Sequence, residues 1–72
     1  MRDDAERRIL KSFGNRVRKN RVRLGLSQED LAERADLDRT YISGIERGLR
    51  NVALLNLYRI AEAMDVRVAD LF

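Results

Sequence analysis

The side chains whose types and spacing are best suited to bind a partner lie in the stretch 37–51, which reads LDRTYISGIERGLRN. On a helical wheel, Ile42 and Ile45 fall on one side and a polar, positive set falls on the other. At about 100° per residue this set spans roughly 140° and comprises Arg39, Thr40, Ser43, Gly44 and Arg47. Tyr41 and Glu46 lie at its borders. The pattern predicts a short helix that packs through one face and presents hydrogen-bonding groups on the other.

These groups are suited to the edges of nucleic-acid bases. Arginine can donate two parallel hydrogen bonds to guanine, threonine can donate, accept or touch the methyl group of thymine, and glycine allows close approach. Tyr41 could pack on a sugar or on a thymine methyl group. An enzyme is not expected, because the chain has no cysteine and no histidine, the residues that most often serve as nucleophile, general base and metal ligand. We therefore expect no catalytic residue, no cofactor and no metal.

Two short helices joined by a tight turn would hold these residues in place. Ser27 is a good N-cap for a helix that ends at about residue 35, and acidic residues in its first turn suit the helix dipole. Asp38 would cap a second helix, 39–47, which Gly48 ends. The pattern predicts a helix-turn-helix over about 27–48, in which the second helix enters the major groove and the first crosses the backbone.

The rest of the 72-residue chain is expected to complete a single all-α domain of five helices. A first helix over about 5–24 would bury the apolar stripe Ile9, Leu10, Phe13 and Val17. A fourth helix over about 53–64 would bury Leu54, Leu57, Ile60, Ala61 and Met64, and a last helical turn is expected at 68–71. A domain this small buries only about 60% of the surface that its unfolded chain exposes, which favours a partner subunit.

Charge is distributed unevenly along the chain, whose net charge is +3. After an acidic start at Asp3, Asp4 and Glu6, no acidic residue occurs before Glu29, and the stretch between them carries Arg7, Arg8, Lys11, Arg16, Arg18, Lys19, Arg21 and Arg23. Such a block favours a polyanionic partner, although a solvated face that keeps the protein soluble is the alternative. We expect most of these cations to supply a field, with Arg18 among those that contact phosphate.

The sequence also predicts where the protein resides. No apolar run approaches the roughly 20 residues needed to span a bilayer, and the N-terminal MRDDAERRIL lacks the apolar core of a signal peptide. A soluble cytoplasmic protein with no membrane partner is expected. There is no room for a separate effector domain, so a small-molecule effector is not expected either.

The segment LSQEDLAERADLDRTYISGIERG closely resembles the helix-turn-helix of the lambda-repressor/Cro-like (XRE) family. The likeness covers about 13–72, and SQEDLA and YISGIERG stand at the expected separation. Within the family, LDRTYISGIERGLRN is most similar to the small controller proteins of restriction–modification systems, although phage repressors and antitoxins share most of it. Two positions depart from the family pattern. Asp36 stands where glycine is common, and aspartate tolerates the left-handed conformation better than most residues; Val52 stands where proline is common.

The resemblance implies DNA contacts at the matching positions. The residues facing the groove would be Arg39, Thr40, Tyr41, Ser43 and Gly44, with Arg39 and Thr40 the foremost base readers. Phosphate contacts would come from Gln28 at the start of the first helix of the motif, and from Arg47, Arg50 and Asn51 just beyond the second.

The resemblance also implies structural roles. Ala32 would let the two helices of the motif cross closely, and Ile42 and Ile45 would anchor the second. An ion pair between Arg21 and Glu46 would be structural rather than DNA-reading. The final segment, about 65–72, would form a two-fold dimer contact through Val68, Leu71 and Phe72.

An acidic edge on the first helix of the motif allows a further hypothesis. Glu29, Asp30 and Glu33 would by default complement the helix dipole and be solvated. Since activators of this family use this helix, Glu29 and Glu33 could instead contact an RNA polymerase sigma factor. The hypothesis would be abandoned if charge-neutral changes at both positions left DNA binding and promoter activation intact.

Together these features predict a sequence-specific DNA-binding transcriptional regulator that binds an inverted-repeat operator as a homodimer and controls its own and the endonuclease promoter. Its two recognition helices would lie about 34 Å apart. A phage-type repressor or an antitoxin-like regulator is the nearest alternative. An alternative of another class is a protein-interaction module without a DNA role, such as an antitoxin that caps a toxin.

Overall fold

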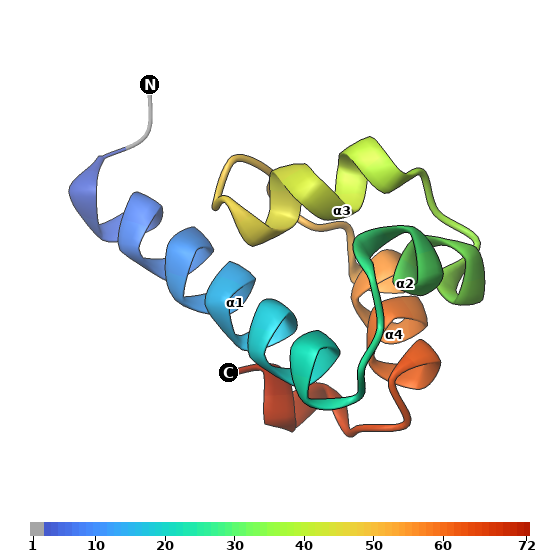
Figure 1. Ribbon diagram of the computed structural model, residues 1–72. Coiled ribbons are helices and arrows are strands. Elements are labelled where there is room, and N and C mark those ends of the chain that lie inside the picture. The colour runs from blue at the N-terminus through green and yellow to red at the C-terminus, as the bar shows by residue number, and fades with distance from the viewer. Residues whose placement is uncertain (1–2) are drawn as a thin grey trace.

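The computed structural model describes residues 3–72 of the chain. This part forms four α-helices, α1 (Asp4–Arg23), α2 (Gln28–Ala35), α3 (Arg39–Glu46) and α4 (Leu54–Ala63), followed by the 3-10 turn η1 (Val68–Leu71) (Figure 1). It contains no strand, so the all-α class is confirmed. The expected fifth helix is a single 3-10 turn, held by the Asp70 carboxylate, which accepts a hydrogen bond from the Arg67 backbone N–H at 3.0 Å.

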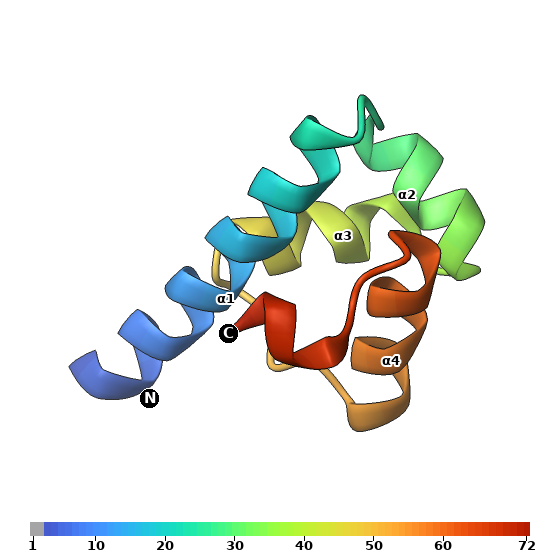
Figure 2. The same cartoon turned by 90° about the horizontal axis from the view of Figure 1, so that it is seen from below.

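The helices pack around one core. The long helix α1 lies against α3, and α2 packs on both α3 and α4. The turn η1 closes the core because it contacts both α4, which precedes it in the chain, and α1, at the other end of the chain (Figure 2). In Figure 1, α3 lies on one side of this core and η1 on the other, so the C-terminal segment does not cover the outer face of α3.

The fully buried side chains come from every element. They are Val17, Leu31, Ile42, Ile45, Ile60, Met64 and Leu71. Two residues expected in the core are instead exposed: Ile9 by 62% and Leu54 by 67%. Only the part of α1 from Phe13 onward has buried residues, so Ile9 lies beyond the core, and Leu54 is the first residue of α4, which is covered only from its second turn.

All four α-helices end in the same way, with one residue in the left-handed conformation. These residues are Gly25, Asp36, Gly48 and Asp65, with φ between 55° and 74°. In each case the next residue donates its backbone N–H to a carbonyl five positions earlier, as Leu37 does to Ala32 at 2.9 Å. This is the bond of a Schellman ending, which satisfies a carbonyl that the helix leaves free. The expectation for Asp36 is confirmed, whereas the similar role of Asp65 was not anticipated.

Gly14 sets the distance between α1 and α3. It is buried, and a Cβ atom at this position would overlap the carbonyl oxygen of Ile45 and lie 2.8 Å from that of Glu46. Both neighbours are backbone atoms at the end of α3, so neither can move aside as a flexible side chain would. Gly14, a residue that disfavours the helical conformation, is thus required by the packing of the two helices.

Replacing Gly14 by alanine therefore tests this contact, because the sign of the change in the free energy of unfolding depends on it. In an exposed helix the change would stabilise by up to about 1 kcal/mol; here overpacking should instead lower the free energy of unfolding by about 1–3 kcal/mol. Urea denaturation followed by circular dichroism measures it. Asn15→Ala, at the next and exposed position, is the matched control and should be neutral or slightly stabilising. A stabilising Gly14→Ala would contradict the close approach.

Candidate nucleic-acid interface

Two reciprocal caps define the start of α2. The Ser27 hydroxyl accepts the Asp30 backbone N–H at 2.9 Å, and the Asp30 carboxylate accepts the Ser27 backbone N–H at 2.9 Å. This capping box satisfies orphan N–H groups of the first turn. The hydrogen bond from the Ser27 backbone N–H lowers the pKa of the Asp30 carboxyl, so the acidic edge of α2 is partly structural. Glu29 and Glu33, by contrast, are exposed on this helix.

The start of α3 is capped by Asp38. Its Oδ1 atom accepts two hydrogen bonds from Thr40, one from the backbone N–H at 2.8 Å and one from the hydroxyl at 2.7 Å. The two bonds, with that from the hydroxyl first, lower the pKa of Asp38. A carboxyl whose pKa is lowered in the folded state stabilises that state above its unfolded pKa, and this contribution disappears as the pH falls through the folded pKa. The cap is therefore ionised and intact at neutral pH.

The outer face of α3 is only partly as expected. Arg39 and Thr40 are exposed in its first turn, while Ile42 and Ile45 are buried beneath it. Ser43 is half-buried. Arg39 and Thr40 are therefore the side chains of α3 that are exposed to a ligand approaching from outside.

Gly44 does not lie open on this face, contrary to the expectation for a groove-facing residue. It is buried beneath Arg50, whose Cγ would lie 2.9 Å from a Cβ atom at this position. The reason is tertiary, because Arg50 belongs to the connection between α3 and α4 and folds back over the helix. Gly44 is thus small in order to seat the stem of this arginine.

Tyr41 is half-buried between α3 and α4. Its hydroxyl accepts a hydrogen bond from the Asn56 side chain at 3.3 Å, and the guanidinium of Arg50 lies 5.7 Å from the centre of its ring. A cation at this distance over an aromatic face is attracted to it. Tyr41 therefore positions Arg50, while part of its own side chain stays exposed.

The ion pair expected between Arg21 and Glu46 is present. Arg21 donates to Glu46 through Nε at 2.6 Å and through Nη2 at 2.9 Å, and its Nη1 donates to the Leu26 carbonyl at 2.8 Å. The hydrogen bonds with Glu46 raise the pKa of Arg21 further. The Glu46 side chain is only 4% exposed. The pair joins the end of α1, the connection to α2 and the end of α3.

A third member of this network was not anticipated. The Gln28 amide donates a hydrogen bond to Oε1 of Glu46 at 3.1 Å. Gln28 was expected only as a phosphate contact, and its pairing with a residue 18 positions later leaves no trace in a local pattern. The amide retains a second N–H, and the start of α2 offers free backbone N–H groups.

The remaining candidates for phosphate contacts lie just beyond α3 and on α1. Arg47, Arg50 and Asn51 are exposed where the chain leaves α3, and Arg18 is exposed on α1. The backbone of Lys11 lies against Gly48, 3.0 Å from where a Cβ atom would be, so the basic helix α1 runs directly beside this connection. In residues 3–72, no group of acidic side chains is arranged to hold a metal ion, and no helix is long and apolar enough to cross a membrane.

The comparison with known proteins decides the family. Residues 17–71 match the helix-turn-helix family HTH_3. The chain belongs to this helix-turn-helix family. This membership confirms the expected XRE-type family and agrees with the expectation of a regulator rather than an enzyme.

Within the helix-turn-helix family, the relatives include several control proteins. The chain is 52% identical over 60 residues to Control protein C.BamHI of Bacillus amyloliquefaciens, covering 82% of this chain and 74% of that one. It is 48% identical over 61 residues to Control protein C.MunI of a Mycoplasma species, covering 83% and 82%.

Solved structures agree with these relatives. The crystal structure of the restriction–modification controller protein C.AhdI of Aeromonas hydrophila superposes with a TM-score of 0.86 at 49% identity, covering 88% of this chain and 96% of that one. The controller protein C.Esp1396I, solved as a tetramer with its natural 35-base-pair operator, gives 0.80 at 41% identity, with coverages of 88% and 83%.

The stability of this helix-turn-helix should depend on Glu46. Glu46→Ala leaves the partly buried Arg21 without its counter-charge, which should cost about 3–5 kcal/mol in the free energy of unfolding. Chemical denaturation measures the loss. The matched control is Asp4→Ala, which removes the ion pair with Arg7 at 2.8 Å, whose side chains are 79% and 69% exposed; it should cost below about 1 kcal/mol. Equal losses for the two variants would refute the structural role of the buried pair.

Proposed function

We propose that this protein is a sequence-specific DNA-binding transcriptional regulator of the restriction–modification controller type. The observation that carries the proposal is the first turn of α3, where Arg39 and Thr40 are exposed on a helix anchored by buried isoleucines. A helix-turn-helix places this turn against the base edges in the major groove. The resemblance to controller proteins, one of them solved on its operator, supports the same assignment.

Phosphate contacts would lie on both sides of the first turn of α3. Gln28 would contribute its second amide N–H or the backbone N–H groups of α2, while Arg47, Arg50 and Asn51 would act from the other end of α3. Arg18 and the other cations of α1 would add attraction over a longer range. Such contacts position a protein on DNA without reading its sequence. In a cell the regulator would act in the cytoplasm, in association with the nucleoid. Glu29 and Glu33 would remain free to contact a polymerase sigma factor.

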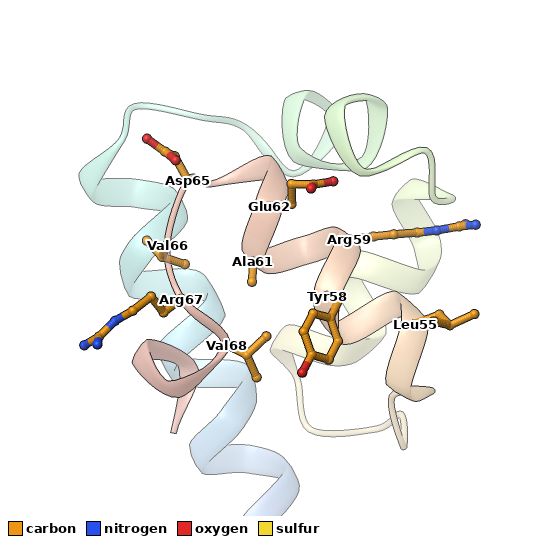
Figure 3. A pocket seen from close by; sticks show the side chains of 9 residues that line it. All are labelled: Leu55, Tyr58, Arg59, Ala61, Glu62, Asp65, Val66, Arg67 and Val68. Carbon is orange, nitrogen blue, oxygen red and sulfur yellow. The ribbon is translucent and has the colours of Figure 1, made fainter.

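We propose that a homodimer binds an inverted repeat through a contact surface that differs from the one expected from the sequence. Leu71 was expected in the interface, but it is fully buried in the core of its own chain. Phe72 is 63% exposed and its ring lies 5.4 Å from that of Phe13, so it serves both the core and the surface. Val68 lines a groove between α4 and the C-terminal segment (Figure 3).

This groove is the apolar surface that best fits a second copy of the chain. Tyr58 and Val68 face each other across it, and Leu55, 72% exposed, projects from the same helix as Tyr58 (Figure 3). Exposed apolar side chains rimmed by polar ones are typical of protein–protein contact sites. The rim carries both signs, Arg59 and Arg67 with Glu62 and Asp65, so two copies related by a two-fold axis can pair unlike charges.

Selection of bound duplexes from a random DNA pool at about physiological salt tests the proposed function directly. A two-fold symmetric motif with half-sites about one helical turn apart is expected. Arg39→Ala should relax the preference at one defined base position and cost about 1–3 kcal/mol in binding. Arg50→Ala, the comparison variant, should weaken all sequences alike and reduce the salt slope by about one unit. Recovery of no motif would favour the protein-interaction module instead.

Dimerisation can be tested apart from DNA. Leu55→Lys places a charge in the proposed interface, and because Leu55 is exposed the monomer should still fold. Sedimentation at tens of micromolar, where the wild type should be dimeric, should show mainly monomer for this variant. Val22→Lys is the matched control, since Val22 is 58% exposed on α1 beside Arg18 and Arg23; it should remain dimeric. A monomeric wild type, or the same behaviour in both variants, would argue against this interface.

A further inference from the structure

The hydroxyl proton of Thr40 is already committed within the protein. A threonine hydroxyl has one proton and two lone pairs. In this structure the Thr40 hydroxyl lies 2.7 Å from Oδ1 of Asp38. An ionised carboxylate can only accept hydrogen bonds, so the proton must lie on the line from Thr40 to Asp38. The same Oδ1 atom also holds the Thr40 backbone N–H at 2.8 Å, which fixes the geometry from two sides.

Toward a ligand, the Thr40 hydroxyl can therefore accept a hydrogen bond but cannot donate one. Its hydroxyl oxygen presents lone pairs, and its methyl group presents an apolar surface. Asp38 is exposed next to it, and since both bonds converge on Oδ1, the Oδ2 atom adds a second acceptor. Arg39, between the two in sequence, carries only donors. The first turn of α3 thus holds a donor group and an acceptor group side by side.

The donors of Arg39 and the acceptor of Thr40 are complementary to different bases. In the major groove, guanine shows acceptors at N7 and O6 and thymine an acceptor at O4, whereas adenine and cytosine show the amines N6 and N4. A free threonine can serve either kind of base. A threonine whose hydroxyl proton is engaged in the hydrogen bond to Asp38 can accept a hydrogen bond from an amine, but it faces a keto oxygen with lone pair against lone pair.

We propose that Asp38 is a specificity-determining residue, which makes Thr40 an acceptor-only reader and so selects an amino base, adenine or cytosine, over a keto base at the position facing Thr40. Arg39 would select guanine nearby through its donors. The inference rests on the proposed function, because it requires α3 to lie in the major groove. It also narrows that function, since it assigns the chemistry of one operator position to a contact within the protein.

Single-amine deletions in the selected operator test the proposal. In each half-site every adenine is replaced in turn by purine and every cytosine by 2-pyrimidinone, which removes only the exocyclic amine. At one position the wild type should bind about tenfold more weakly. Thr40→Val keeps the shape of the side chain but lacks the hydroxyl, so it should bind the intact operator about tenfold more weakly than the wild type does. Deleting the amine at that position should not weaken the binding of this variant any further. Thr40→Ser, which keeps the hydroxyl, should retain the sensitivity.

Asp38→Ser then separates the role of Asp38 from that of Thr40. Serine is also a good N-cap, so α3 should still form, as circular dichroism can verify, but a neutral hydroxyl releases Thr40 to donate. Exchanging the amino base for the keto base of the same ring size, as a full base pair, should penalise the wild type by about tenfold and this variant several-fold less. The guanine read by Arg39 should stay equally important in both.

The outcomes distinguish this inference from the function on which it rests. If the wild type selects no motif, the proposed function fails and the inference fails with it. If a motif is selected but every amine deletion that weakens binding of the wild type weakens binding of Thr40→Val equally, the inference alone is overturned. It is also overturned if Asp38→Ser leaves the keto-base penalty unchanged.

Discussion

The buried carboxylate of Glu46 is the interaction on which the rest of the structure depends. It accepts hydrogen bonds from two atoms of Arg21 and from Gln28, and so joins α1, the start of α2 and the end of α3. A charge taken out of water is costly unless it is paired and hydrogen-bonded. Since all three donors must be in place together, the network favours one relative arrangement of these helices over the many that apolar packing alone would allow.

The close approach of α1 and α3 works with this network. Gly14 lets the backbone of α1 touch the last carbonyls of α3, next to Glu46. The short helices α2 and α3, of eight residues each, would be marginal alone. Their caps, their left-handed endings and their packing on α1 and α4 hold them instead. The first turn of α3 is therefore presented on a rigid support, as base reading requires.

Recognition and assembly are assigned to different parts of the molecule. The proposed reading groups lie on the first turn of α3, and the proposed dimer surface lies on α4 and the C-terminal segment. A protein that reads DNA through so few side chains gains specificity when two copies read two half-sites together. With the proposed dimer, protein concentration would become the regulatory signal, because the concentration of dimer rises with the square of the concentration of free monomer.

The sequence by itself determined the elements and the motif. Caps at Ser27 and Asp38, the ending at Gly48 and the apolar spacing are local signals, and they predicted α2, α3 and the turn between them. The ion pair of Arg21 with Glu46 was predicted from the family resemblance. Tertiary structure decided what covers each face. It buried Leu71, exposed Ile9 and Leu54, laid Arg50 over Gly44 and tied Gln28 to Glu46. Periodicity identifies the apolar side of a helix, but which neighbour lies against it depends on contacts between residues far apart in the chain.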